Sequence, residues 1–144
     1  MGKGVSLKCT KCNYKKEHHL GVGMIIHAML LKDYIDLNLP MHNKTKEKIK
    51  RLYYKKENLI IEPIIKLYKC KECNKIYNKY YFEIYNNPEY EYSNEGLEPI
   101  FKTEFKCWRC NLELKEINLE KLNKAVCPKC GNYSFNKDAL FLWD

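Results

Sequence analysis

Apolar side chains between residues 21 and 39 recur every three to four positions, a spacing typical of a helix. The stretch reads GVGMIIHAMLLKDYIDLNL and is followed by Pro40, which cannot continue a helix. The pattern predicts a helix over 24–39 that is apolar around more than half of its circumference. Such a helix is expected to be buried against a sheet. The alternative is that it covers a partner surface, for example in a homodimer.

Residues 44–57 also show helical spacing, but in a strongly basic segment. KTKEKIKRLYYKKE contains seven basic and two acidic side chains, and its apolar positions fall on one side. The pattern predicts a short basic amphipathic helix. One interpretation is that its cations contact phosphates, with a tyrosine near a base; the other is a solvated lysine-rich face. The candidate nucleic-acid-binding residues are Lys48, Lys50, Arg51, Tyr53, Tyr54 and Lys55.

The remaining apolar patterns predict strands. Residues 59–65, LIIEPII, have high strand propensity, with Pro63 at an edge or bend. Residues 76–85, IYNKYYFEIY, predict a long aromatic strand, whose tyrosines either form a stacking platform or cover a shallow core. Shorter strands are expected at residues 5–8, 67–69, 102–106, 113–117 and 139–143.

Four CxxC pairs, or knuckles, lie at the ends of these predicted strands. They are KCTKCN, KCKECN, KCWRCN and VCPKCGN, and their second cysteines are followed by Asn13, Asn74, Asn111 and Gly131. Asn and Gly tolerate a positive φ, which helps the chain leave a tight turn. Such a turn lets two thiolates converge on one ion. Two turns supply the four sulfurs of a tetrahedral zinc site, so the sequence predicts two Zn2+ ions.

The spacing of the knuckles predicts which cysteines share an ion. Sixteen residues separate the third and fourth knuckles, close to the spacing of a zinc ribbon. Sequential pairing is therefore expected, and the alternative joins the second knuckle to the third and the first to the fourth. The expected sites are Cys9, Cys12, Cys70 and Cys73 (site 1) and Cys107, Cys110, Cys127 and Cys130 (site 2). His18 or His19 could replace a cysteine, although eight cysteines already complete two shells.

The expected fold class is a small metal-bound α+β protein, with zinc-ribbon-like antiparallel hairpins and a helical insertion in its N-terminal unit. Residues 1–88 would form this zinc-knuckle unit, with inserted helices at about 21–57. Residues 89–99, EYEYSNEGLEP, are acidic and rich in turn residues, and are expected to be a linker. Residues 100–144 would form a C-terminal zinc ribbon. Units this small usually need a metal staple, because each has a thin core.

The chain has 144 residues and a formal net charge of +8, and only two of its 26 basic residues are arginine. If eight thiolates bind two Zn2+ ions, the net charge falls to +4, which is mild. Lys, Asn, Ile and Tyr have AT-rich codons, so base composition accounts for part of the lysine excess. The sequence shows neither a secretory signal nor a membrane span. The expected location is the cytoplasm, where CxxC pairs usually bind metal.

The stretch from Phe105 to Trp143 resembles a zinc ribbon. The whole chain also resembles small uncharacterised bacterial zinc-ribbon proteins that open with a knuckle followed by Leu-Gly-x-Gly-Met, here residues 20–24. They close with CPKCG and a strand ending in Trp-Asp, here residues 127–131 and 143–144. The resemblance implies the fold and the cysteine ligands, but no activity.

The expected function is therefore a non-enzymatic module with two structural four-cysteine zinc sites that binds a protein or a nucleic acid. No HExxH motif or Gly-rich phosphate loop is present, and no catalytic residue is predicted. The first alternative is a nucleic-acid-binding zinc ribbon, associated with transcription or translation, that uses the basic segment 44–57. The second is a metalloenzyme or redox protein with one open metal site, including a rubredoxin-like iron site.

Overall fold

The computed structural model describes residues 2–24, 27–53, 55–56, 58–89 and 93–144. The chain forms two compact units, each built from separate stretches. Unit 1 comprises residues 1–25, 65–79 and 104–144, and unit 2 comprises residues 26–64 and 80–103. This division differs from the predicted one, because the described residues of the predicted linker, 89 and 93–99, lie within unit 2 and residues 1–88 are divided between both units. Two long strands contribute residues to both units. The units therefore cannot be separated by cutting the chain at a single position.

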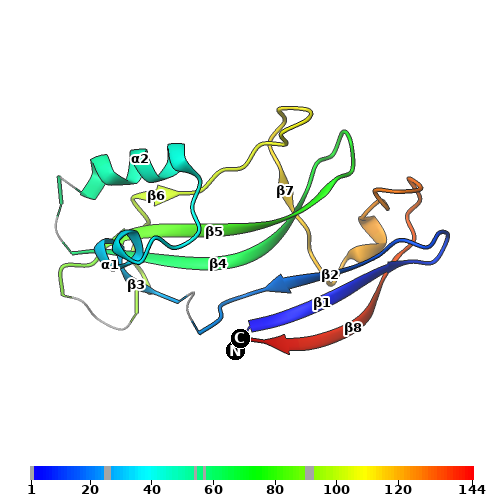
Figure 1. The fold of residues 1–144 in the computed structure, drawn as a ribbon, viewed down its shortest axis with the longest axis horizontal. Helices are drawn as coiled ribbons and strands as arrows, with labels where there is room; N and C mark the ends of the chain where they lie inside the picture. Colours follow the sequence, from blue (N-terminus) through cyan, green and yellow to red (C-terminus); the bar gives the residue numbers. More distant parts are fainter. Residues whose placement is uncertain (1, 25–26, 54, 57, 90–92) are drawn as a thin grey trace. The chain divides into compact units, whose positions relative to one another are not determined.

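Unit 1 contains a three-stranded antiparallel sheet in the order β2-β1-β8 (Figure 1). Its strands are β1 (Gly2–Cys9), β2 (Lys15–Leu20) and β8 (Phe135–Trp143). The first knuckle connects β1 to β2. Val5 of the central strand lies opposite His18 on one side and Leu140 on the other, which sets the register. A register shift between Ser6 and Leu7 marks a bulge in the β1–β8 pair.

The inward face of this sheet begins the core of unit 1. Val5 and Leu7 are completely buried on β1, since alternate residues of a strand share a face. The segment before β8 contains β7 (Lys115–Glu116) and the 3-10 turn η1 (Leu122–Lys124), and it also contributes side chains to this core. The buried residues of this core are Val5, Leu7, Cys9, Leu67, Ile76, Ile117, Leu122, Ala125, Cys127 and Phe135. The core therefore includes two cysteines from distant parts of the chain, Cys9 and Cys127.

The opposite face of the sheet carries aromatic side chains of β8. Glycines in β1 leave room for them: a Cβ on Gly4 would lie 2.1 Å from ring carbons of Phe141. His19 contacts the same ring edge-on, with the ring centres 5.6 Å apart. The indole N–H of Trp143 donates to the carbonyl oxygen of Lys3 at 3.0 Å, which ties the end of β8 to β1.

Replacing Gly4 by alanine is expected to destabilise the protein by about 1–3 kcal/mol, because the new methyl group displaces the Phe141 ring. Urea denaturation followed by tryptophan fluorescence measures this loss. In a Phe141→Leu background the ring is absent, and the same glycine substitution should cost clearly less. Equal costs in the two backgrounds would show that the ring does not cover Gly4.

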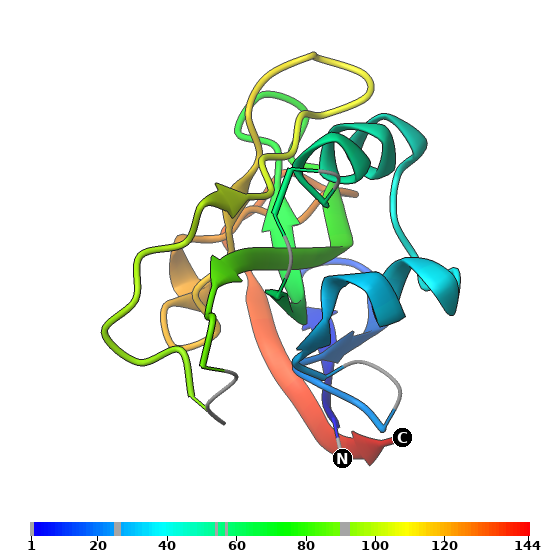
Figure 2. The same ribbon diagram turned by 90° about the vertical axis from the view of Figure 1, so that its left-hand side faces the viewer.

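Unit 2 contains two helices and part of a second sheet, in which the strand order is β3-β4-β5-β6 and β7 also pairs with β4. Its elements are β3 (Met29–Leu30), α1 (Leu31–Asp36), α2 (Asn43–Tyr53) and β6 (Phe101–Lys102), and it shares β4 (Leu59–Lys69) and β5 (Ile76–Asn86) with unit 1. Figure 2 shows both helices on the same side of the green strands β4 and β5. The buried side chains between helices and strands are Leu31, Tyr34, Ile49, Leu59, Ile61, Phe82 and Ile84. Among the described residues, this core contains no cysteine.

The predicted helix over residues 24–39 is much shorter in the structure. α1 covers only Leu31–Asp36, and the two preceding residues form β3, which pairs with β4. Sheet hydrogen bonds to the edge of β4 therefore replace helical ones there. Asn38 has a positive φ of 51°, a conformation that ends helices, so the helix does not reach Pro40. Residues 25–26 of the predicted helix lie outside the described residues.

The apolar side chains that suggested a homodimer surface take two kinds of position. Leu31 and Tyr34 are buried in the core of unit 2, so the core-packing interpretation applies to α1. Met24 and Leu37 remain 73% and 64% exposed. A homodimer through this stretch stays a prediction that rests on these exposed positions.

The basic amphipathic helix is confirmed as α2, although it ends before residue 57. Ile49 is completely buried and Leu52 packs against the same core, as the apolar spacing predicted.

Within the part of the chain that the structure describes, no helix has the length and apolar character needed to cross a bilayer. The predicted strands are confirmed in position and differ in length. For 102–106, the structure has β6 and then an isolated bridge between Lys106 and Glu113.

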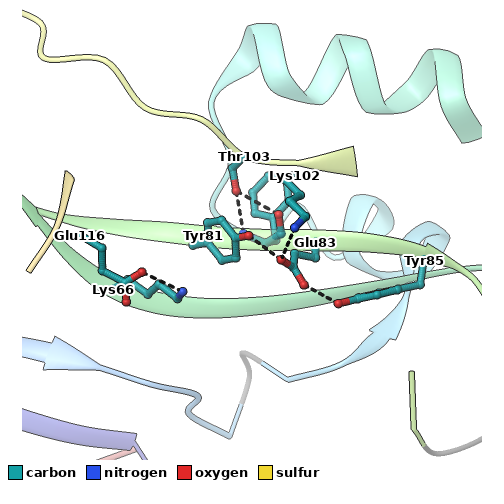
Figure 3. A network of polar contacts seen from close by, with 8 residues as sticks. Lys66, Tyr81, Glu83, Tyr85, Lys102, Thr103 and Glu116 are labelled. Carbon is teal, nitrogen blue, oxygen red and sulfur yellow. Dashed lines mark hydrogen bonds and ion pairs between the residues drawn. The ribbon is translucent and has the colours of Figure 1, made fainter. Parts of the chain in front are cut away.

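Two tyrosines of the aromatic strand β5 take part in a polar network (Figure 3). The hydroxyl groups of Tyr81 and Tyr85 both donate to the carboxylate of Glu83. Lys102 of β6 approaches the same carboxylate at 3.7 Å. Burial and the Glu83 carboxylate raise the pKa of Tyr85 above its ordinary value. These tyrosines therefore direct their hydroxyl groups to a neighbouring side chain within unit 2.

Candidate metal centres

The eight cysteines gather into two groups of four, all in unit 1. Cys9, Cys12, Cys127 and Cys130 form the first cluster, and Cys70, Cys73, Cys107 and Cys110 form the second cluster. Within each cluster the four sulfur atoms all lie within 4.8 Å of one another. The cysteines are free thiols, not disulfides. Among the described residues, no third group of this kind occurs.

The sulfur separations match those of a tetrahedral metal site. In the first cluster, the two pairs of sulfur atoms that face each other across the knuckles are 3.6 and 3.7 Å apart. In the second cluster, the sulfur atoms of Cys73 and Cys107 are 3.7 Å apart. A regular tetrahedron with metal–sulfur distances of about 2.3 Å has edges of about 3.8 Å. The donor set and its spacing therefore fit a thiophilic cation.

Each knuckle is closed by the same backbone hydrogen bond. The first cysteine donates its N–H to the carbonyl oxygen five residues later, at 2.8–3.0 Å in all four knuckles. Asn74, Asn111 and Gly131 have positive φ values of 58°, 56° and 75°, as the sequence predicted, whereas Asn13 does not. The N–H groups of these three residues donate back to the carbonyl oxygen of the first cysteine. The turns therefore hold their paired sulfurs in place through local backbone geometry.

Hydrogen bonds to sulfur lower the pKa of Cys9 and Cys130 in the first cluster and of Cys107 in the second. For Cys9, burial opposes the thiolate, but the Ser134 hydroxyl at 2.8 Å and backbone N–H groups lower its pKa to about 6. For Cys107, the Tyr77 hydroxyl at 3.2 Å is the largest influence, and the pKa also falls to about 6. Neither Ser134 nor Tyr77 was singled out from the sequence, because both reach their sulfur only through the fold.

One further sulfur in each cluster resists ionisation. Burial and the neighbouring sulfurs raise the pKa of Cys110 to about 12. For Cys12 a backbone hydrogen bond from Tyr14 lowers the pKa, but burial and the neighbouring sulfurs outweigh it and raise the pKa to about 12. Like charges confined within a few ångströms cannot all form without compensation. A divalent cation supplies that compensation and deprotonates its coordinating thiols. The electrostatics of each cluster thus suit a bound metal ion.

The pairing of the knuckles is not the sequential one. The structure joins the first knuckle to the fourth and the second to the third, so expected sites 1 and 2 do not form as groups of four. The alternative pairing raised from the sequence is the one present. The expected ribbon over 100–144 also fails, because its two knuckles belong to different clusters.

Strand pairing explains this arrangement. β1 ends at Cys9, opposite Phe135 at the start of β8, so the first and fourth knuckles meet at one end of the sheet. The second knuckle lies between β4 and β5. β4 pairs with β7 through Lys69 and Lys115, which brings the third knuckle beside the second. The apolar character of β8 is visible in the sequence, but its partner is not.

His18 and His19 belong to neither cluster. His18 is buried, and its Nδ1 donates to the side-chain oxygen of Asn78 at 2.5 Å, because the Asn78 amide nitrogen already donates to the His19 carbonyl. Within the described residues, His18 Nε2 is buried without a hydrogen-bond partner. Burial lowers the pKa of His18 below its ordinary value.

Acidification is therefore expected to weaken the fold through His18. The folded state has the lower pKa, so this contribution to stability is complete above about pH 6.5 and is lost as pH falls toward the folded-state pKa. Urea denaturation at pH 8.0, 7.0 and 6.0 measures the loss, with the metal content determined at each pH. A His18→Gln variant should lose less stability over this range. A pH dependence identical to that of the parent would exclude His18 as its cause.

The candidate nucleic-acid residues lie on and after α2, away from the cysteines in sequence. Lys48, Lys50, Arg51 and Lys55 are exposed, Tyr53 is partly buried against the core of unit 2, and Tyr54 lies outside the described residues. The ammonium group of Lys48 lies 5.2 Å from the centre of the Phe101 ring. Among the described residues of this group, the structure shows a cationic surface without a highly exposed aromatic ring.

No protein-family model matches the chain, and no curated protein or solved structure matches it. The resemblance to small bacterial zinc-ribbon proteins therefore rests on the sequence motifs alone, and both this family and a bacterial origin stay predictions. The described residues form an antiparallel, sheet-rich fold with two short helices and two four-cysteine clusters that can hold metal ions.

Proposed function

We propose that this chain is a non-enzymatic interaction module shaped by two structural zinc ions. The observation that supports it is the joining of distant segments by each cluster: cysteines 121 residues apart, Cys9 and Cys130, have sulfurs 3.6 Å apart. An ion there cross-links β1 to the turn before β8. In the second cluster an ion cross-links the β4–β5 turn to the segment before β7.

Four thiolates complete the tetrahedral shell of zinc, so no coordination position is left for a substrate or a reacting water. Structural sites have this closed shell, whereas catalytic zinc sites keep one position open. A metalloenzyme or redox protein with one open site is the alternative. It would require one cysteine of a cluster to be replaced by water when metal is bound.

Zinc is favoured over iron because it is the commoner structural ion in four-sulfur sites. The eight free thiols also fit a reducing compartment, and we propose the cytoplasm. The partner of the module is a protein or a nucleic acid. The net positive charge of the chain favours a nucleic acid.

Metal analysis of the purified full chain tests this proposal. We expect two zinc ions per chain and a colourless protein. A red protein with iron would indicate rubredoxin-like sites, and a loading capacity below two ions per chain would exclude two closed four-sulfur sites. X-ray absorption at the zinc edge should show four sulfur neighbours per ion, and an oxygen in the shell would favour the enzyme alternative.

A further inference from the structure

We propose that the surface beside the second cluster binds single-stranded nucleic acid, with Trp108 stacking on an unpaired base. This inference rests on the proposed function, because the metal ion of the second cluster would hold the two knuckles that carry the surface. We call this surface the tip patch. Its residues are Lys75, Tyr77, Lys79, Phe105, Trp108 and Arg109.

Trp108 is the feature of the tip patch that points to a ligand. It lies inside the third knuckle, between Cys107 and Cys110, and its side chain is 73% exposed. Single exposed apolar side chains are common, but contiguous exposed apolar patches commonly mark binding sites, and the Trp108 ring shares the neighbouring ammonium group of Lys75 with the Tyr77 ring. Because both flanking cysteines belong to the second cluster, the backbone under the ring is restrained. A base that stacks on it therefore loses little affinity to the ordering of the chain.

Two lysines lie beside this ring and its aromatic neighbours. The ammonium group of Lys75 lies 4.5 Å from the centre of the Trp108 ring and 5.7 Å from that of Tyr77. The ammonium group of Lys79 lies 5.2 Å from the centre of the Tyr77 ring and 5.7 Å from that of Phe105. Interleaved cations and rings are the components that single-stranded nucleic-acid grooves use, the cations for phosphates and the rings for bases.

The two knuckle segments carry an excess of positive charge. Residues 69–79 and 104–115 contain seven basic side chains and three acidic ones. One of the acidic side chains, Glu113, is paired with Lys115 at 3.6 Å. Four thiolates with one Zn2+ reduce the net charge of these segments from +4 to +2, but Cys70 and Cys107 are buried whereas Lys71, Lys75 and Arg109 are exposed. An approaching ligand therefore meets the cations first.

This composition favours a single strand over the other partners. The base faces of a duplex are covered by their neighbours, so an exposed indole can stack only on an unpaired base or a strand end. Lysine is depleted at protein–protein interfaces and contacts phosphate as a point charge, which suits a backbone. α2 offers cations as well, but its described tyrosine, Tyr53, packs against the core of unit 2. The tip patch therefore offers both cations for phosphates and an exposed ring for a base, whereas the described residues of α2 offer the cations alone.

The experiment uses the zinc-loaded full chain and fluorescein-labelled dT12 and U12, with a 12-base-pair duplex as comparison. We expect saturable binding at low salt that weakens as salt rises, preference for the single strands, and quenching of tryptophan fluorescence. Trp108→Ala should weaken binding about 5- to 150-fold and abolish the quenching, whereas Trp108→Tyr should keep most of the affinity. Lys75→Gln with Lys79→Gln should weaken binding and reduce its salt dependence.

Tyr133→Ala is the matched control. Tyr133 is 71% exposed and follows the fourth knuckle, which belongs to the first cluster. It should bind like the parent chain. Neutralising Lys48, Lys50 and Arg51 tests the site predicted on α2 in the same assay. If this variant loses binding and Trp108→Ala does not, the inference is overturned in favour of α2.

Three further outcomes would overturn the inference: no binding to either oligonucleotide at low salt, equal binding by Trp108→Ala, or duplex binding as tight as single-strand binding. The first would leave the tip patch to a protein partner. The zinc content of every variant is measured alongside. A chain that holds two zinc ions and fails to bind contradicts only this inference. A chain that binds oligonucleotides without any metal contradicts the proposed structural role of zinc.

Discussion

Removal of both metal ions is expected to unfold unit 1. A structural zinc contributes on the order of 10 kcal/mol to the folding of a small domain, comparable to the whole stability of most domains of this size. The core of unit 1 contains Cys9 and Cys127, and each cluster holds together segments that are distant in sequence. Without the ions, the sulfurs lose their bonds to a cation and cannot all remain ionised side by side. The knuckles of each cluster then lose the link that joins them.

Two spectroscopic signals separate the units in this experiment. Both tryptophans, Trp108 and Trp143, lie in unit 1, whereas α1 and α2 lie in unit 2. A strong zinc chelator should shift the tryptophan emission to the red and reduce the helical far-ultraviolet signal less, because the core of unit 2 contains no cysteine among its described residues. Added Zn2+ should restore the emission, and added Mg2+ should not. An unchanged thermal transition after complete metal removal would contradict the structural role of the ions.

Paired cysteine substitutions are expected to separate the two possible arrangements of the knuckles. Cys9→Ser with Cys127→Ser damages only the first cluster, so this chain should retain one metal ion. Cys9→Ser with Cys70→Ser damages both clusters and should retain none. Serine keeps the size of the side chain but replaces the soft sulfur donor with an oxygen that zinc binds less well at these sites.

Metal content is measured after dialysis against a mild chelator, so that weakened three-sulfur sites are emptied. Cys70→Ser with Cys107→Ser is the matched control for the second cluster and should also retain one ion. Sequential pairing gives the opposite result for the first two variants: none for Cys9 with Cys127, and one for Cys9 with Cys70. The metal count therefore decides the pairing directly.

The part of the site that could be predicted from the sequence is the local part. A CxxC pair followed by Asn or Gly specifies its own turn, because the closing hydrogen bond spans only five residues. The basic helix and the long strands were also predictable, since each depends on the periodicity of its own side chains. The helix over 24–39 was wrong in its first half, because Met29 and Leu30 pair with the edge of β4. That edge provides backbone partners which no local pattern reveals.

The ligand set of each metal ion depends on strand pairing, which is non-local. The spacing between the third and fourth knuckles resembles a ribbon, but β8 pairs with β1 at the other end of the chain and draws the fourth knuckle with it. β4 similarly draws the third knuckle to the second through β7. The number of residues between two knuckles sets the largest distance that can separate them. It does not determine which of several possible knuckles shares an ion with a given one.

The four tight turns of the eight cysteines follow from the local sequence, because a turn is built from the residues it contains. The fold sets which turns meet, which side chains donate to their sulfurs, and which aromatic rings stay in water. These properties depend on contacts between distant segments: Ser134, which donates to the Cys9 sulfur, is 125 residues away from it. The free energy of such contacts comes from whole strands and cores, and no short motif encodes it.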